Sequence, residues 1–94
     1  MQQPVIIDSH AHLDYPQLAA DLPGVLARAE TAGVRQIISI GVKLSTSHVP
    51  REIAEAHDNV WFSIGVHPHE AANEPLSCDR DAFLAAADHP KCVA

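Results

Sequence analysis

The sequence has few cysteine and few aromatic residues, and each shortage excludes a class of protein. Its 94 residues include 2 cysteines, Cys78 and Cys92, which are too few for a disulfide framework or a zinc ribbon. We therefore expect both thiols to be reduced and to take no part in function. Aromatic residues make up 4% of the chain, whereas alanine, valine and isoleucine are plentiful. This composition favours helices packed on a buried sheet over an all-β sandwich.

Positive charge and long apolar runs are also scarce. The 6 Lys and Arg residues are outnumbered by 12 Asp and Glu, which gives a formal net charge of -6. The chain therefore lacks the basic surface that binds nucleic acid non-specifically, and a bound cation would have to attract any phosphate substrate. No segment approaches the roughly 20 apolar residues that span a bilayer. The N-terminus also lacks the pattern of a signal peptide. These absences predict a cytoplasmic protein without a membrane partner.

Apolar, β-branched segments alternate with helical patterns along the chain. Residues 5–9 are expected as a strand buried on both faces, residues 34–42 as a second buried strand and residues 60–66 as a third, and residues 92–94 would begin a fourth. The expected helices cover residues 21–33, with an Asp21 cap and a Gly33 stop, residues 50–57, and residues 79–89, with an Asp79 cap; residues 13–20 and 73–78 are expected as loops. Such alternation predicts an α/β fold with a parallel sheet and right-handed crossovers, in one domain over residues 1–94.

Two pairs of histidines follow two of the expected strands. His10 and His12 come at the end of the first strand, and His67 and His69 follow the third. Side chains at positions i and i+2 of a strand share a face, so two imidazoles can converge on one cation such as zinc. Because the carboxyl ends of parallel strands meet at one rim, we expect both pairs there. Asp8 could orient an imidazole, although a carboxylate that only caps loop amides explains it equally well.

Three short segments, in this order and spacing, are characteristic of a protein family: D-S-H-A-H-L-D at residues 8–14, I-G-V at 40–42 and G-V-H-P-H at 65–69. In these segments the chain resembles the TatD family of metal-dependent hydrolases, which is similar to the wider amidohydrolase superfamily. The resemblance implies a (β/α)8 TIM barrel, of which these residues would cover the first three β/α units and the start of strand 4. It also implies deoxyribonuclease activity on DNA with one or two divalent metal ions per site. The metal could be zinc, magnesium or manganese.

The resemblance also assigns roles to the histidines. His10 and His12 match the family's metal ligands, and His67 matches an active-site histidine that faces the scissile phosphate. His69 matches less closely, and a loop histidine without a role in the site is the preferred interpretation. The family's glutamate ligand and its later ligands would fall beyond Ala94. Because two histidines do not complete a four-coordinate zinc site, we predict that this chain has no nuclease turnover by itself.

Two alternatives remain open. One is an amidohydrolase relative that cleaves amide, lactone or phosphotriester bonds, for which a lysine in place of the fourth-strand glutamate would be diagnostic. The other is a non-catalytic chain that self-associates, because part of a barrel exposes a sheet edge and apolar helix faces. For the complete protein, the expected chemistry is hydrolysis by water whose pKa a bound metal lowers to about 7.

Overall fold

The computed structural model describes residues 5–70 and 80–94, which form a parallel sheet with helical connections. The strands, in spatial order, are β1 (Ile6–Ala11), β2 (Val34–Ser39) and β3 (Val60–Phe62). The α-helices are α1 (Pro16–Ala19), α2 (Leu22–Thr31), α3 (His48–Ala56) and α4 (Arg80–Ala87). Two short 3-10 helices, η1 (Leu44–Thr46) and η2 (Pro68–Glu70), follow β2 and β3. The predicted α/β fold with a parallel sheet is confirmed.

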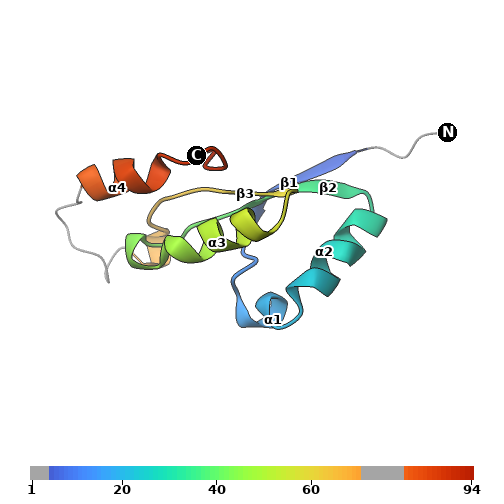
Figure 1. The fold of residues 1–94 in the computed structure, drawn as a ribbon. Helices are drawn as coiled ribbons and strands as arrows, with labels where there is room; N and C mark the ends of the chain where they lie inside the picture. The colour runs from blue at the N-terminus through green and yellow to red at the C-terminus, as the bar shows by residue number, and fades with distance from the viewer. Residues whose placement is uncertain (1–4, 71–79) are drawn as a thin grey trace.

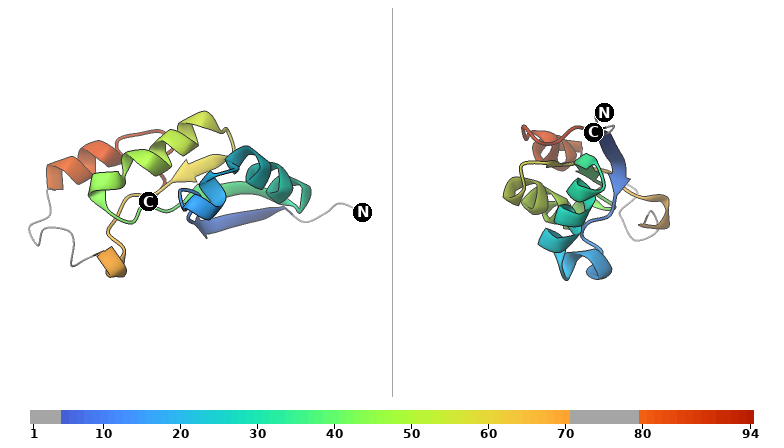
Figure 2. Two further views of the ribbon diagram at one scale, coloured as in Figure 1. Left: turned by 90° about the horizontal axis from the view of Figure 1, so that it is seen from below. Right: turned by 90° about the vertical axis from the view of Figure 1, so that its right-hand side faces the viewer.

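The crossover helices α2 and α3 lie on the same face of the sheet (Figure 1, Figure 2). The residues buried in the core, most of them between the helices and the sheet, are Leu13, Leu26, Ile37, Ala54, Val60 and Phe62. Phe62 is fully buried, and burial of such a side chain contributes about 1.5–3 kcal/mol. This core fixes the strands relative to one another, and with them the segments that leave their carboxyl ends.

The opposite face of the sheet is apolar and exposed. Successive side chains of a strand alternate between faces, so the neighbours of the core residues project to this side. An open pocket of about 320 Å³ on this face is lined by Ile7, Gln36, Ile38, Trp61 and Val93. The expectation that the first strand is buried on both faces is wrong: β1 is the edge of the sheet, and residues 6–10 are exposed. Ile7 alone keeps 60% of its surface exposed.

The last four residues run beside β3, as expected for the start of a fourth strand. Cys92 forms an isolated parallel bridge with Phe62. Lys91 Nζ donates hydrogen bonds to the carbonyl oxygens of Ala54 and His57, at 2.5 and 2.6 Å. A cation at the carboxyl end of α3 also complements the helix dipole. Lys91 therefore ties the end of the chain to the helix layer.

The segment after β1 differs from the prediction. Residues 13–20, expected as a loop, contain the short helix α1. Pro16 begins this helix, where its fixed φ suits the first turn and its missing amide is not needed. The amide of Ala19 donates to the carbonyl of Tyr15 at 2.8 Å. A proline that appeared to break the pattern in fact starts a helical turn.

Several boundaries also moved. β2 ends at Ser39 and β3 at Phe62, earlier than predicted, and glycines at positions 41 and 65 weaken the regular strand beyond these points. Asp21 is the N-cap of α2, but its side chain makes no capping hydrogen bond; Gly33 does stop this helix, with a φ of 102°. The expected loop at 73–78 and the Asp79 cap lie outside the described residues. Within residues 5–70 and 80–94 no helix has the length and apolarity to cross a membrane.

Candidate metal-binding site

The structure brings three of the predicted site histidines together at the carboxyl ends of β1 and β3. His10 is the penultimate residue of β1, His12 directly follows that strand, and His67 lies beyond β3. The ring centroids of His10 and His12 are 5.1 Å apart, with their planes at 77°. The centroids of His12 and His67 are 6.3 Å apart, at 72°. The side chain of His69 is outside what the structure describes.

Main-chain hydrogen bonds hold this rim together beyond the regular strands. The amide of Ile40 donates to the carbonyl of Ala11 at 2.9 Å, which fixes the end of β1 to the end of β2. The amide of His67 donates to the carbonyl of Val42 at 2.7 Å. A peptide hydrogen bond therefore ties the main chain at His67 to the segment that follows β2.

Gly41 allows a close approach between the segments that follow β2 and β3. Its amide donates to the carbonyl oxygen of Ser63 at 3.1 Å and lies 3.3 Å from Ser63 Oγ. A Cβ at position 41 would lie 2.5 Å from that carbonyl oxygen, which is far inside van der Waals contact. Only glycine therefore fits this point of the I-G-V segment without displacing its neighbour.

Three buried polar atoms at the rim have no hydrogen-bond partner within the described residues. They are Nδ1 of His12, Oδ1 of Asp14 and Oγ of Ser39, the last residue of β2. An unpaired buried polar atom costs about 1–3 kcal/mol, so such atoms are rare unless a ligand, ion or water completes them. The sequence singled out His12 as a metal ligand, and its unpaired nitrogen is what an imidazole that awaits a cation would show.

Asp8 contacts the rim through the main chain. Its Oδ1 accepts a hydrogen bond from the amide of His10 at 3.0 Å. This contact fixes the backbone at His10. Asp8 itself is exposed, and its proposed role of orienting an imidazole stays a prediction.

A small pocket adjoins the histidines. It measures about 130 Å³, and its lining residues are Tyr15, Val42, His67 and Glu70. Oε2 of Glu70 lies 3.9 Å from Nζ of Lys43, so the pocket-lining carboxylate is part of an ion pair. Tyr15 and Glu70 were not expected at the site. The sequence offers a signal for Tyr15 alone, because it stands three residues after His12 and directly before a proline.

The histidines fit part of a metal site. Within the described residues no group of three or more His, Cys, Asp or Glu side chains is placed to hold a metal ion. His10 and His12 nevertheless present two imidazoles edge to face, one of them with an unpaired buried nitrogen. This donor set suits a divalent transition metal and requires further ligands to complete its coordination.

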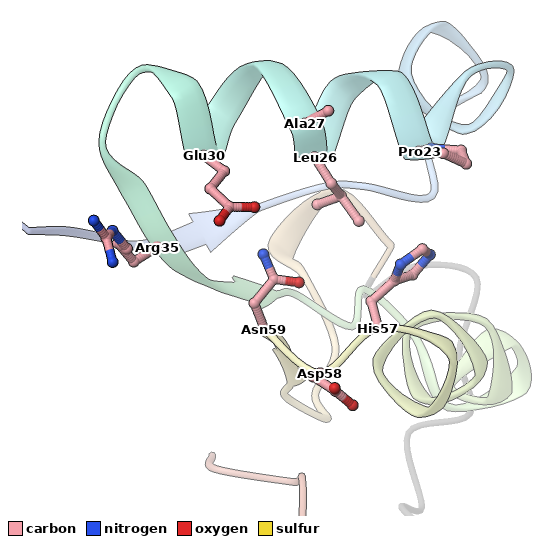
Figure 3. A pocket seen from close by; sticks show the side chains of 8 residues that line it. All are labelled: Pro23, Leu26, Ala27, Glu30, Arg35, His57, Asp58 and Asn59. Atoms are coloured by element: carbon pink, nitrogen blue, oxygen red, sulfur yellow. The ribbon is translucent and has the colours of Figure 1, made fainter.

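A larger pocket lies far from these histidines. It measures about 450 Å³ and opens between α2 and the turn from α3 into β3 (Figure 3). Its lining residues are Pro23, Leu26, Ala27, Glu30, Arg35, His57, Asp58 and Asn59. Arg35 is near the start of β2 and Asn59 directly precedes β3. The pocket is therefore at the amino ends of the strands, whereas sites in parallel sheets form at the carboxyl ends.

Parallel α/β enzymes carry their reacting groups where the strands end, and this chain has three imidazoles there. The fold and the site thus define an α/β protein with a histidine-bearing rim. The chain belongs to the TatD family: the family model described as "TatD related DNase" matches residues 7–94. The resemblance seen in the three sequence segments is confirmed.

Similar proteins carry names that indicate a hydrolase. The "3'-5' ssDNA/RNA exonuclease TatD" of Salmonella typhimurium is 33% identical over 90 residues, which cover 95% of this chain and 34% of the relative. The protein of the same name from Edwardsiella piscicida is 35% identical over 82 residues, 84% of this chain and 32% of the relative. The "Uncharacterized metal-dependent hydrolase YcfH" of Escherichia coli is 36% identical over 84 residues, 86% of this chain and 31% of the relative. The chain thus spans about a third of the length of the curated relatives it matches.

Proposed function

We propose that this protein hydrolyses phosphodiester bonds in DNA with one or two divalent metal ions, and that His10 and His12 are two of the ligands. The observation that carries the proposal is the buried, unpaired Nδ1 of His12 beside the ring of His10. Relatives named as exonucleases and as a metal-dependent hydrolase support it. Because these relatives are about three times as long, we further propose that the three strands are the first part of a (β/α)8 barrel in a longer cytoplasmic polypeptide.

The residues of the rim would have different roles in this reaction. A divalent ion, when bound, lowers the pKa of its water and offsets the charge of the phosphodiester, which an acidic chain cannot do alone. His10 and His12 hold the ion. His67 lines the adjacent pocket and donates a hydrogen bond to a non-bridging phosphate oxygen, where charge grows during the reaction. Asp8 keeps the main chain of His10 in place through its 3.0 Å hydrogen bond.

The residues present also limit the chain. Two imidazoles leave a metal with open positions, so we propose that residues 1–94 alone bind metal weakly and do not turn over DNA. Cleavage of amide, lactone or phosphotriester bonds is the second candidate. The names of the relatives favour phosphodiesters, since several are called exonucleases acting on single-stranded DNA and RNA.

Metal binding tests the proposal directly. The purified chain is titrated with zinc by calorimetry, in the wild type, in His10→Ala/His12→Ala and in His48→Ala. His48 is an exposed histidine at the start of α3 and serves as the matched control. We expect at least about tenfold weaker binding in the double variant, because even residues behind metal ligands contribute that much. The control should match the wild type. Equal affinity in all three proteins would refute the ligand assignment.

Substrate class needs a separate assay. Any longer natural polypeptide that contains residues 1–94 is offered 3′-labelled single-stranded DNA, a lactone and a phosphotriester, each with and without chelator. We expect chelator-sensitive release of nucleotides from DNA and its loss in His67→Ala. Turnover of the lactone or phosphotriester without cleavage of DNA would favour the amidohydrolase alternative.

A further inference from the structure

We propose that Tyr15 is a positioning residue that holds the imidazole of His12 in the plane required for metal binding. This inference rests on the proposed role of His12 as a ligand. The rings of Tyr15 and His12 are stacked, with centroids 4.8 Å apart and planes only 16° from parallel. The neighbouring contact of His12 with His10 is different in kind, because those planes meet at 77°. One face of the His12 ring is thus covered by Tyr15, while the ring of His10 meets it edge to face.

The main chain explains how Tyr15 reaches His12. The amide of Tyr15 donates to the carbonyl of His12 at 3.2 Å, which closes a turn between them. Leu13, inside this turn, is buried in the core with 2% of its surface exposed. The buried side chain of Leu13 therefore holds the turn against the core. The turn in its place brings the ring of Tyr15 over the imidazole of His12.

The backbone of Tyr15 is fixed on its other side as well. Pro16 follows it, and a residue before proline is restricted to extended conformations; Tyr15 has φ -63° and ψ 139°. Its carbonyl accepts hydrogen bonds from the amides of Leu18 and Ala19 at 2.9 and 2.8 Å. The ring therefore projects from a backbone that is held by turn, proline and helix together, before any metal arrives.

A fixed ring matters because an imidazole rotates easily about its Cβ–Cγ bond, for which the preferred angles are broad. A parallel aromatic neighbour selects one plane among these rotations. Nδ1 of His12, the nitrogen on which the ligand assignment rests, is buried and has no hydrogen-bond partner within the described residues. The stack with Tyr15 restrains the plane in which this nitrogen would meet a metal, a role comparable to that of the groups that hydrogen-bond the other nitrogen of many metal-bound histidines.

Three substitutions separate this role from general packing. Tyr15→Phe keeps the ring, Tyr15→Leu keeps apolar bulk without an aromatic plane, and Tyr15→Ala removes both. In the metal-free chain, the His12 ring protons should show ring-current shifts by NMR in the wild type and Tyr15→Phe, and lose them in the other two. Zinc affinity by calorimetry should be unchanged in Tyr15→Phe and about three- to tenfold weaker in Tyr15→Leu and Tyr15→Ala.

The outcomes distinguish this inference from the proposed function. If His12→Ala weakens zinc binding and Tyr15→Leu leaves it at the wild-type value, Tyr15 does not position the ligand and the inference is wrong. If neither variant changes the affinity for zinc, both the assignment of His12 as a ligand and the role of Tyr15 are wrong. Tyr15→Leu also decides the matter where Tyr15→Ala loses its fold, because leucine keeps apolar bulk at this half-exposed position. Weakening in Tyr15→Phe equal to that in Tyr15→Leu would likewise contradict a role for the ring.

Discussion

Replacement of Gly41 by alanine should loosen the rim of the sheet. The new Cβ would lie 2.5 Å from the carbonyl oxygen of Ser63, and ordinary contact begins at 3.4 Å, so the two segments must separate by about 0.9 Å (3.4 minus 2.5). A shift of that size stretches the 3.1 Å hydrogen bond from the Gly41 amide to about 4.0 Å, which is beyond bonding distance. Overpacking costs about 1–3 kcal/mol and a lost hydrogen bond about 1 kcal/mol. We therefore expect the free energy of unfolding to fall by about 2–4 kcal/mol.

Urea unfolding followed by circular dichroism measures this loss, and Gly65→Ala provides the matched control. Nothing lies within 4 Å of a Cβ built at Gly65, so that substitution should change the unfolding free energy by less than about 0.5 kcal/mol. Gly41→Ala should also shift the NMR signals of the His67 amide, which bonds to the neighbouring Val42. Equal stability of the two variants would refute the argument that close approach requires glycine at position 41.

Two further predictions concern the chain outside the rim. Lys91→Met should lower the free energy of unfolding by about 1–3 kcal/mol in urea, because the carbonyls of Ala54 and His57 lose a charged donor; a change below about 0.5 kcal/mol would show that water replaces it. Ile7→Lys should reduce self-association in sedimentation experiments, since Ile7 is 60% exposed on the uncovered sheet face. Leu84→Lys, at a similarly exposed position on α4, is the control, and equal effects of both would exclude the sheet face as the contact.

Much of the fold could be predicted because local pattern and tertiary structure agree. The β-branched runs predicted β2 and β3 near their observed positions, and Gly33 marked the end of α2 correctly. Burial of the first strand was mispredicted, because an apolar run does not reveal whether a second layer covers it. The helix α1 was missed because Pro16 serves equally well to end an element and to begin one.

For the candidate site, the sequence supplied the histidines and the structure supplied their surroundings. His10, His12 and His67 were placed at one rim by the rule that parallel strands end together, and the structure brings them within 5.1 and 6.3 Å. The stacked ring of Tyr15 depends on a turn whose hydrogen bond and buried Leu13 no spacing rule specifies. The spacing of Tyr15 from His12 and the proline after it indicate a turn, but the stacking of the two rings is seen only in the folded chain.

The peptide hydrogen bonds at the ends of β2 and β3 also bear on how this rim could change during evolution. His67 keeps its place because its amide is bound to the carbonyl of Val42, and peptide groups are the same whatever side chain they carry. The bond itself does not depend on the side chain at position 42, although Val42 lines the same pocket as His67. Substitutions that line the pocket could therefore change what enters it while this main-chain link to the segment after β2 is kept.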